Sequence, residues 1–156
     1  MKDGRPTPPV PPEVDLQGLD GFMLDTARLL GSELVALSTG DEFKAAMLLW
    51  CRAWRQIPGS SLPNDERVLC SFAGLSTNKR AWKKVRAIAM RGWFECADGR
   101  LYHRVLAADA LKAWAGRVAF RERTKAATEA RRRQRNDQRN VDVTTTTGTG
   151  TGTEER

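Results

Sequence analysis

Apolar side chains recur at helical spacing between residues 23 and 37. Successive members of this stripe lie three or four residues apart, which predicts a single amphipathic helix with this face turned to a core. The stripe consists of Met23, Ala27, Leu30, Leu34 and Leu37.

A second helix is predicted directly after the first. A hydroxyl at Ser38 or Thr39, followed by Asp41 and Glu42, is typical of a helix start, and Ile57-Pro58-Gly59 is typical of a helix end. The residues expected to be buried are Phe43, Ala46, Met47, Trp50 and Trp54.

Two shorter helices joined by a tight turn are predicted in the middle of the chain. Asn64-Asp65 can cap a helix that ends at Gly74, and Ser76 or Thr77 can cap the next helix, which runs to about Met90. Two helices in this arrangement match the helix-turn-helix pattern. The apolar face expected on the second of them comprises Ala81, Trp82, Val85, Ile88 and Ala89.

A β-hairpin is predicted next. Asp98-Gly99 between apolar and aromatic residues indicates a type I′ turn, which needs a positive φ at both central positions. Pairing across that turn sets Cys96 opposite Leu101 and Phe94 opposite His103. It leaves three side chains on the other face, namely Arg100, Tyr102 and Arg104.

A last helix is predicted from about Leu106, with Ala107, Leu111, Trp114 and Val118 facing the core. The order of elements predicts a mainly α fold with a small β-hairpin, a winged helix-turn-helix domain flanked by disordered tails. The expected parts are a disordered proline-rich arm over 1–20, the domain over 21–120, a basic helical extension over 121–140 and a disordered Thr/Gly-rich tail over 141–156.

Composition narrows the class of protein. The chain has 156 residues, of which 40% are hydrophobic and 29% charged, enough for one ordinary domain. We expect a cytoplasmic protein with no membrane partner, because the chain has neither an apolar run of roughly 20 residues nor the apolar segment of a secretory signal. Three widely spaced cysteines do not form a disulfide framework.

The positive charge is concentrated in one part of the chain. Residues 79–139 carry 18 basic and 6 acidic side chains, whereas residues 1–70 carry 7 basic and 10 acidic ones. Such asymmetry favours a polyanionic partner such as nucleic acid, although a solvated basic surface is the simpler alternative.

The basic helix is the best candidate for a binding site. Residues 79–91 include six basic side chains and no acid, and Lys79, Lys83 and Arg86 form one stripe beside the apolar face. This arrangement suits the major groove of double-stranded DNA, with Thr77, Asn78, Lys79 and Lys83 nearest the bases. Generic solvation and an acidic protein partner remain alternatives. The candidate DNA-binding residues are Thr77, Asn78, Lys79, Arg80, Lys83, Lys84, Arg86, Arg100, Arg104, Arg131, Arg132 and Arg133.

No catalytic or metal site is predicted, and no cofactor is expected. His103, the single histidine, lies in a predicted strand and is expected to be packed there, and the chain has no phosphate-binding GxxxxGK[ST] loop. Cys51, Cys70 and Cys96 lack the spacing of zinc ligands and are expected to be core residues. An enzyme is therefore the least favoured class.

Three segments together are similar to a known family. They are FMLDTARLLGSELVALSTGDEFKAAMLLWCRAW, SLPNDERVLCSFAGL and AWKKVRAIAMRGWFECADGRLYHRVLAADALKAW. They resemble the YdaU-like prophage proteins of unknown function over roughly residues 21–121. The resemblance implies a winged-helix DNA-binding protein of a phage or prophage, acting in replication initiation or helicase loading, with a replicative helicase or helicase loader as partner. A winged-helix transcription regulator and an adaptor that recruits a host helicase are the alternatives.

Overall fold

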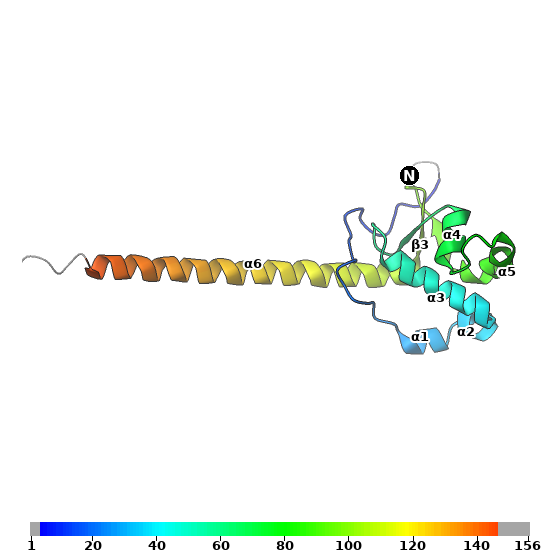
Figure 1. The fold of residues 1–156 in the computed structure, drawn as a ribbon, viewed down its shortest axis with the longest axis horizontal. Helices are drawn as coiled ribbons and strands as arrows, with labels where there is room; N and C mark the ends of the chain where they lie inside the picture. Colours follow the sequence, from blue (N-terminus) through cyan, green and yellow to red (C-terminus); the bar gives the residue numbers. More distant parts are fainter. Residues whose placement is uncertain (1–3, 147–156) are drawn as a thin grey trace, which may run out of the picture. The chain divides into compact units, whose positions relative to one another are not determined.

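The computed structural model describes residues 4–146, a mainly helical chain with a small three-stranded antiparallel sheet (Figure 1). The chain divides into two compact units, Met1–Ala115 and Gly116–Arg156. The elements in order are α1 (Thr26–Leu30), α2 (Glu33–Leu37), α3 (Gly40–Trp54), β1 (Ser61–Pro63), α4 (Glu66–Phe72), α5 (Lys79–Ala89), β2 (Trp93–Glu95), β3 (Arg100–His103) and α6 (Arg104–Thr146).

Helix α3 forms the centre of the first unit and packs against α4, α5 and β1. Its start is confirmed as predicted: the Thr39 side chain and Glu42 form a reciprocal capping box. The main core cluster includes Ala46, Leu49 and Trp82, all buried. The expected core residues Phe43, Met47 and Trp50 are only half-buried, because the buried face of α3 is centred on Ala45, Leu49 and Ala53 instead.

The single amphipathic helix predicted over residues 23–37 is wrong. The chain forms two five-residue helices instead, because the Asp25 side chain caps α1 and the Ser32 side chain caps α2, which starts a new helix at Glu33. Of the predicted apolar stripe, Leu34 packs against the core. Met23 is 88% exposed, and Leu30 and Leu37 are also exposed.

Two short helices, α4 and α5, follow one another across a short turn, as predicted. Asp65 caps α4 as expected, and the chain leaves it through Gly74 in the left-handed region. Helix α5 is capped by Asn78 rather than by Ser76 or Thr77. Ser76 takes a left-handed φ of 53°, which is not the extended backbone of a cap residue, so it serves the turn.

The sheet has the strand order β1-β3-β2. Its third strand, β1, was not predicted, because three residues between two proline-containing turns give no alternation to detect. The predicted hairpin register is wrong by one residue: Phe94 pairs with Tyr102, and Trp93 pairs with His103. Tyr102 is consequently fully buried and does not lie on an exposed face.

The turn chemistry explains the shift in register. Gly99 has a φ of 75°, but Asp98 is not among the described residues with a positive φ, so the type I′ turn is wrong. Cys96 N–H donates to the Arg100 carbonyl at 2.9 Å, which closes a loop of three residues, 97–99. The Tyr102 hydroxyl donates a hydrogen bond to the Asp98 carboxylate at 2.7 Å and so holds this loop in place.

The N-terminal segment is part of the folded unit, contrary to the predicted disordered arm over 1–20. Val10, Val14 and Leu16 are fully buried in a second core cluster with residues of α3, β3 and α6. The segment is also tied by backbone: Gly59 N–H donates to the Val14 carbonyl at 2.8 Å. The prolines limit the backbone freedom of the segment that places these three apolar side chains in the cluster. The proline-rich composition gives no indication of these contacts.

Helix α6 contributes Ala107 and Ala110 to that second cluster, and Leu106 is also buried. The predicted core residues Leu111 and Val118 are exposed, because the buried face of α6 ends within its first turns. In the second unit, the side chains of residues 118–140 are exposed. Of the predicted disordered tail 141–156, residues 141–146 belong to α6, and 147–156 lie outside the described residues. None of the helices described has both the length and the apolar composition for a membrane span.

Candidate nucleic-acid interface

Helix α5 has one buried and one basic side. Trp82, Val85 and Ala89 are buried against the core. The opposite side is exposed, and its first two turns present Lys79, Arg80, Lys83 and Lys84. Within the described part of the chain, no acidic side chain pairs with any of these four cations. They therefore form an unneutralised cationic surface, which we call the α5 basic face.

Arg86, unlike these four cations, is paired with an acidic side chain. Its guanidinium donates to both carboxylate oxygens of Glu66, with Nη2···Oε1 at 2.6 Å and Nε···Oε2 at 3.0 Å. The same carboxylate accepts a hydrogen bond from Trp82 Nε1 at 2.6 Å. The hydrogen bond from Arg86 lowers the pKa of Glu66, and its counterpart raises the pKa of Arg86. The predicted stripe of Lys79, Lys83 and Arg86 is thus reduced to its two lysines.

Asn78 has a structural task at the start of α5. Its Oδ1 accepts a hydrogen bond from Ala81 N–H at 3.0 Å and caps the helix. Reading adenine through two hydrogen bonds needs both the oxygen and the amide nitrogen of an asparagine. While it caps α5, Asn78 has one lone pair of Oδ1 engaged, and its amide nitrogen is free to donate to a base. The neighbouring Thr77 is exposed.

Arg100 and Arg104, the two candidate residues near the hairpin, differ in exposure. Arg100 is half-buried: its Nε donates to Ser61 Oγ at 2.8 Å and its Nη2 to Gln56 Oε1 at 3.3 Å. It joins β3 to β1 and is turned inward. Arg104 is exposed and lies 5.9 Å from the centre of the Phe94 ring.

Two further sets of basic residues bear on the predicted interface. Arg91, just after α5, pairs with Glu33 of α2 at 2.6 Å. Arg131, Arg132 and Arg133 are exposed on α6 within the second unit.

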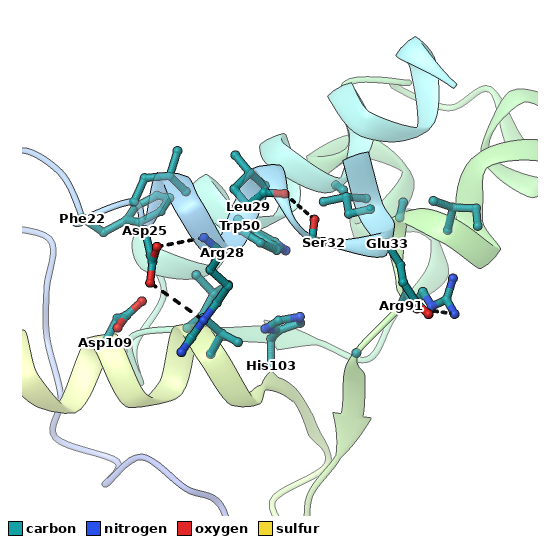
Figure 2. A pocket seen from close by; sticks show the side chains of 18 of the residues that line it. Phe22, Asp25, Arg28, Leu29, Ser32, Glu33, Trp50, Arg91, His103 and Asp109 are labelled. Atoms are coloured by element: carbon teal, nitrogen blue, oxygen red, sulfur yellow. Dashed lines mark hydrogen bonds and ion pairs between the residues drawn. The ribbon is translucent and has the colours of Figure 1, made fainter. Parts of the chain in front are cut away.

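Sequence reasoning missed a pocket in the first unit. Its volume is about 450 Å³, and its lining residues all fall between Phe22 and Asp109. Figure 2 shows Trp50 and His103 inside it, Asp25, Arg28 and Asp109 toward one end, and the Glu33–Arg91 pair toward the other. No sequence pattern marks it, because its walls come from α1, α2, α3, β3 and the ends of α5 and α6.

His103 is held in the wall of this pocket by its neighbours. The rings of Trp50 and Trp93 lie 5.3 and 5.5 Å from the imidazole. Gly92 leaves space for it, since a Cβ there would come within 2.6 Å of Nε2. Burial lowers the pKa of His103 and favours its neutral form. Its Nδ1 is buried without a hydrogen-bond partner in the described chain.

The three cysteines differ in burial. Cys70 and Cys96 are buried, as expected of core residues, whereas Cys51 is exposed, which corrects that expectation. Burial raises the pKa of the Cys96 thiol. Over the residues that the structure describes, no group of three or more His, Cys, Asp or Glu side chains is placed to hold a metal ion.

Comparison with known protein families gives a match. The model of a family described as "Protein of unknown function (DUF1376)" matches residues 22–110, more than half of the chain. No curated protein matches, and no solved structure matches. The matched range contains α1 to β3, the α5 basic face and the whole pocket.

Proposed function

The chain belongs to the DUF1376 family, whose function is unknown, and we propose that this member binds double-stranded DNA through helix α5. The observation that carries the proposal is the α5 basic face. Four exposed cations occupy the first two turns of a helix whose other side is fixed in the core. Phosphates would supply most of the affinity, and base edges reached from the helix start would supply preference for a sequence.

The order of elements around α5 supports a winged-helix interpretation. Helix α3, strand β1, the α4–α5 pair and the β2–β3 hairpin follow one another, and β1 pairs with β3 at the edge away from β2. In such a domain the hairpin serves as the wing. Arg104 is the exposed candidate for a phosphate contact there, because Arg100 is engaged by Ser61 and Gln56.

Glu66 supports the same proposal by positioning the helix. It binds Trp82 on the buried side of α5 and Arg86 at the edge of the basic face. One carboxylate at the start of α4 therefore fixes the rotation of α5 about its own axis. A helix whose orientation is fixed can present the same side chains to the groove each time it binds.

Helix α6 of the second unit offers a second cationic region, with Arg131, Arg132 and Arg133 exposed. We propose that these arginines contact the phosphate backbone without reading sequence. The biological role proposed is replication initiation or helicase loading in a phage or prophage, in bacterial cytoplasm, with a replicative helicase or helicase loader as protein partner. The resemblance to YdaU-like prophage proteins supports that role. A transcription regulator is the second candidate and would use the same helix.

Titration of fluorescent duplex DNA with two matched double variants tests the proposal. Lys79→Gln/Lys83→Gln removes two charges from the α5 basic face, and Lys44→Gln/Lys112→Gln removes two exposed charges elsewhere in the first unit. We expect the first variant to bind duplex at least tenfold more weakly at moderate salt and to lower the salt slope by about 0.9 per lost phosphate contact. The control should change little. Equal losses in both variants, or no binding by the unmodified protein, would overturn the proposal.

A further inference from the structure

We infer that the pocket beneath α1 and α2 is a binding site for a small protonated aromatic amine, independent of DNA binding by α5. The pocket has a volume of about 450 Å³, which is within the range of roughly 300–1,000 Å³ of small-molecule sites. It lies wholly in the part of the chain matched by the family. It is a feature of the domain and not of its tails.

The elements above the pocket are not packed like a core. No residue of α1 or α2 is buried. Leu29 and Leu34 line the pocket and are only half-buried, although Leu34 also packs against the main core cluster. Apolar side chains that surround unfilled space forgo contact with one another, and a ligand can supply that contact. The apolar walls therefore favour an occupant with an apolar body.

The rings in the walls indicate an aromatic body. Trp50 from α3 and His103 from β3 face the pocket, with Phe22 near its edge (Figure 2). Ring pairs at 4.5–7 Å are favourable beyond their buried area, and a tryptophan face also attracts a cation. His103 is held in place by two tryptophans and by the space that Gly92 leaves. Its ring is thus a rigid part of the wall.

The charge of the lining favours a cation. The charged lining residues are Asp25, Arg28, Glu33, Arg91 and Asp109. Glu33 pairs with Arg91 at 2.6 Å, and Asp25 caps α1 and approaches Arg28 at 3.9 Å. Asp109 is half-buried, and its carboxylate makes neither a hydrogen bond nor an ion pair with the described residues. The three lining acids outnumber the two lining arginines, so the lining has a net charge of −1, and the Asp109 carboxylate is the acid left to receive an ammonium group.

Ligand-observed fluorine NMR on the full chain can test this assignment. The probe is para-trifluoromethyl benzylamine, compared with the matching benzyl alcohol and benzoate, which keep the ring and change only the charge. We expect the amine to bind about tenfold more tightly than the alcohol, because a hydrogen bond between an ammonium group and a carboxylate is stronger than one from a neutral hydroxyl. The benzoate should bind most weakly.

Two variants locate the site. Asp109→Asn should reduce the affinity of the amine to that of the alcohol, whereas Asp137→Asn, the same change in the second unit, should leave it unchanged. Val105→Trp should fill the pocket and abolish binding of both probes, provided that its melting temperature and amide spectrum remain native. Chemical shifts of the Trp50 indole, assigned with Trp50→Phe, should move with the amine.

The contrary outcomes are distinct. If no probe binds at millimolar concentration, or if binding survives in a folded Val105→Trp variant, the pocket is not the site. If the three probes bind alike, or if Asp109→Asn has no effect, the assignment to an amine is wrong. Because none of these measurements involves DNA, a failure of the DNA proposal leaves them unaffected.

Discussion

Arg86 and Glu66, twenty residues apart, face each other across the α4–α5 turn, with one guanidinium bound to both oxygens of one carboxylate. The pair is half-exposed, so its own contribution to stability is modest. Its position is more important than its energy. It joins the first turn of α4 to the third turn of α5, and Trp82 Nε1 binds the same carboxylate.

This pairing distinguishes Arg86 from the α5 basic face in DNA binding. We expect Lys83→Ala to weaken duplex binding several-fold and to reduce the salt slope by about 0.9, the loss of one phosphate contact. Arg86→Ala should leave the salt slope almost unchanged, because its charge is already neutralised by Glu66. Fluorescence anisotropy at three or more salt concentrations measures both. Equal slopes for the two variants would mean that Arg86 leaves Glu66 on binding.

The two roles available to Asn78 can be separated by substitution. Asn78→Ala should lower stability by about 0.5–2 kcal/mol through loss of the cap. Asn78→Asp keeps the capping oxygen and should retain stability, but it removes the amide donor and adds a negative charge near the groove. Chemical denaturation checks the first effect. Competition between a selected and a random duplex checks whether Asp at this position erodes sequence preference.

Removing a buried side chain from the N-terminal segment should destabilise the first unit strongly. Leu16 is fully buried, and Leu16→Ala should cost about 2–5 kcal/mol of unfolding free energy. Leu30→Ala is the matched control: Leu30 is 73% exposed, and its loss should change stability by about 0.5 kcal/mol or less. Urea denaturation followed by tryptophan fluorescence measures both. Equal effects would mean that residues 10–16 do not belong to the core.

His103 should make the stability of the first unit depend on pH. Burial lowers its pKa below the ordinary value of 6.5, so the unfolded chain takes up a proton more readily than the folded one. Its contribution is therefore complete above pH 6.5 and is lost as the pH falls through the lower folded pKa, by at most about 1.4 kcal/mol per pH unit. His103→Gln should flatten the fall in stability between pH 7 and pH 5. An unchanged profile would assign that fall to other groups.

Local signals predicted the elements with strong caps and turns. Thr39, Asp65 and Gly74 mark the boundaries of α3 and α4 because each acts on backbone groups within a few residues. The sequence also predicts the exposed cations of α5, because the spacing of Trp82 and Val85 among the lysines determines which side of the helix is buried. The predicted register of the hairpin is wrong by one residue, because Asp98-Gly99 is compatible with two turn types and the burial of Tyr102 decides between them.

The remaining errors concern partners distant in sequence. Whether Arg86 is free depends on Glu66, and whether Val14 is buried depends on Trp54 and Tyr102, with which it shares the second core cluster. Neither relation can be recognised from the spacing of residues or from composition. The pocket belongs to the same class, because no single segment supplies more than a part of its wall.

The contact between the two ends of the first unit also has a consequence for the order of folding during synthesis. The carbonyl of Thr7 accepts a hydrogen bond from the Cys96 thiol, 89 residues later, and Val10 meets α6 in the second cluster. Contacts so distant in sequence form slowly, because a long stretch of chain must be ordered to close them. On the ribosome, the α3–α5 core can assemble while the second cluster still lacks β3 and α6. Until about residue 110 has emerged, Val10, Val14 and Leu16 stay exposed, a period in which the nascent chain presents apolar surface to chaperones.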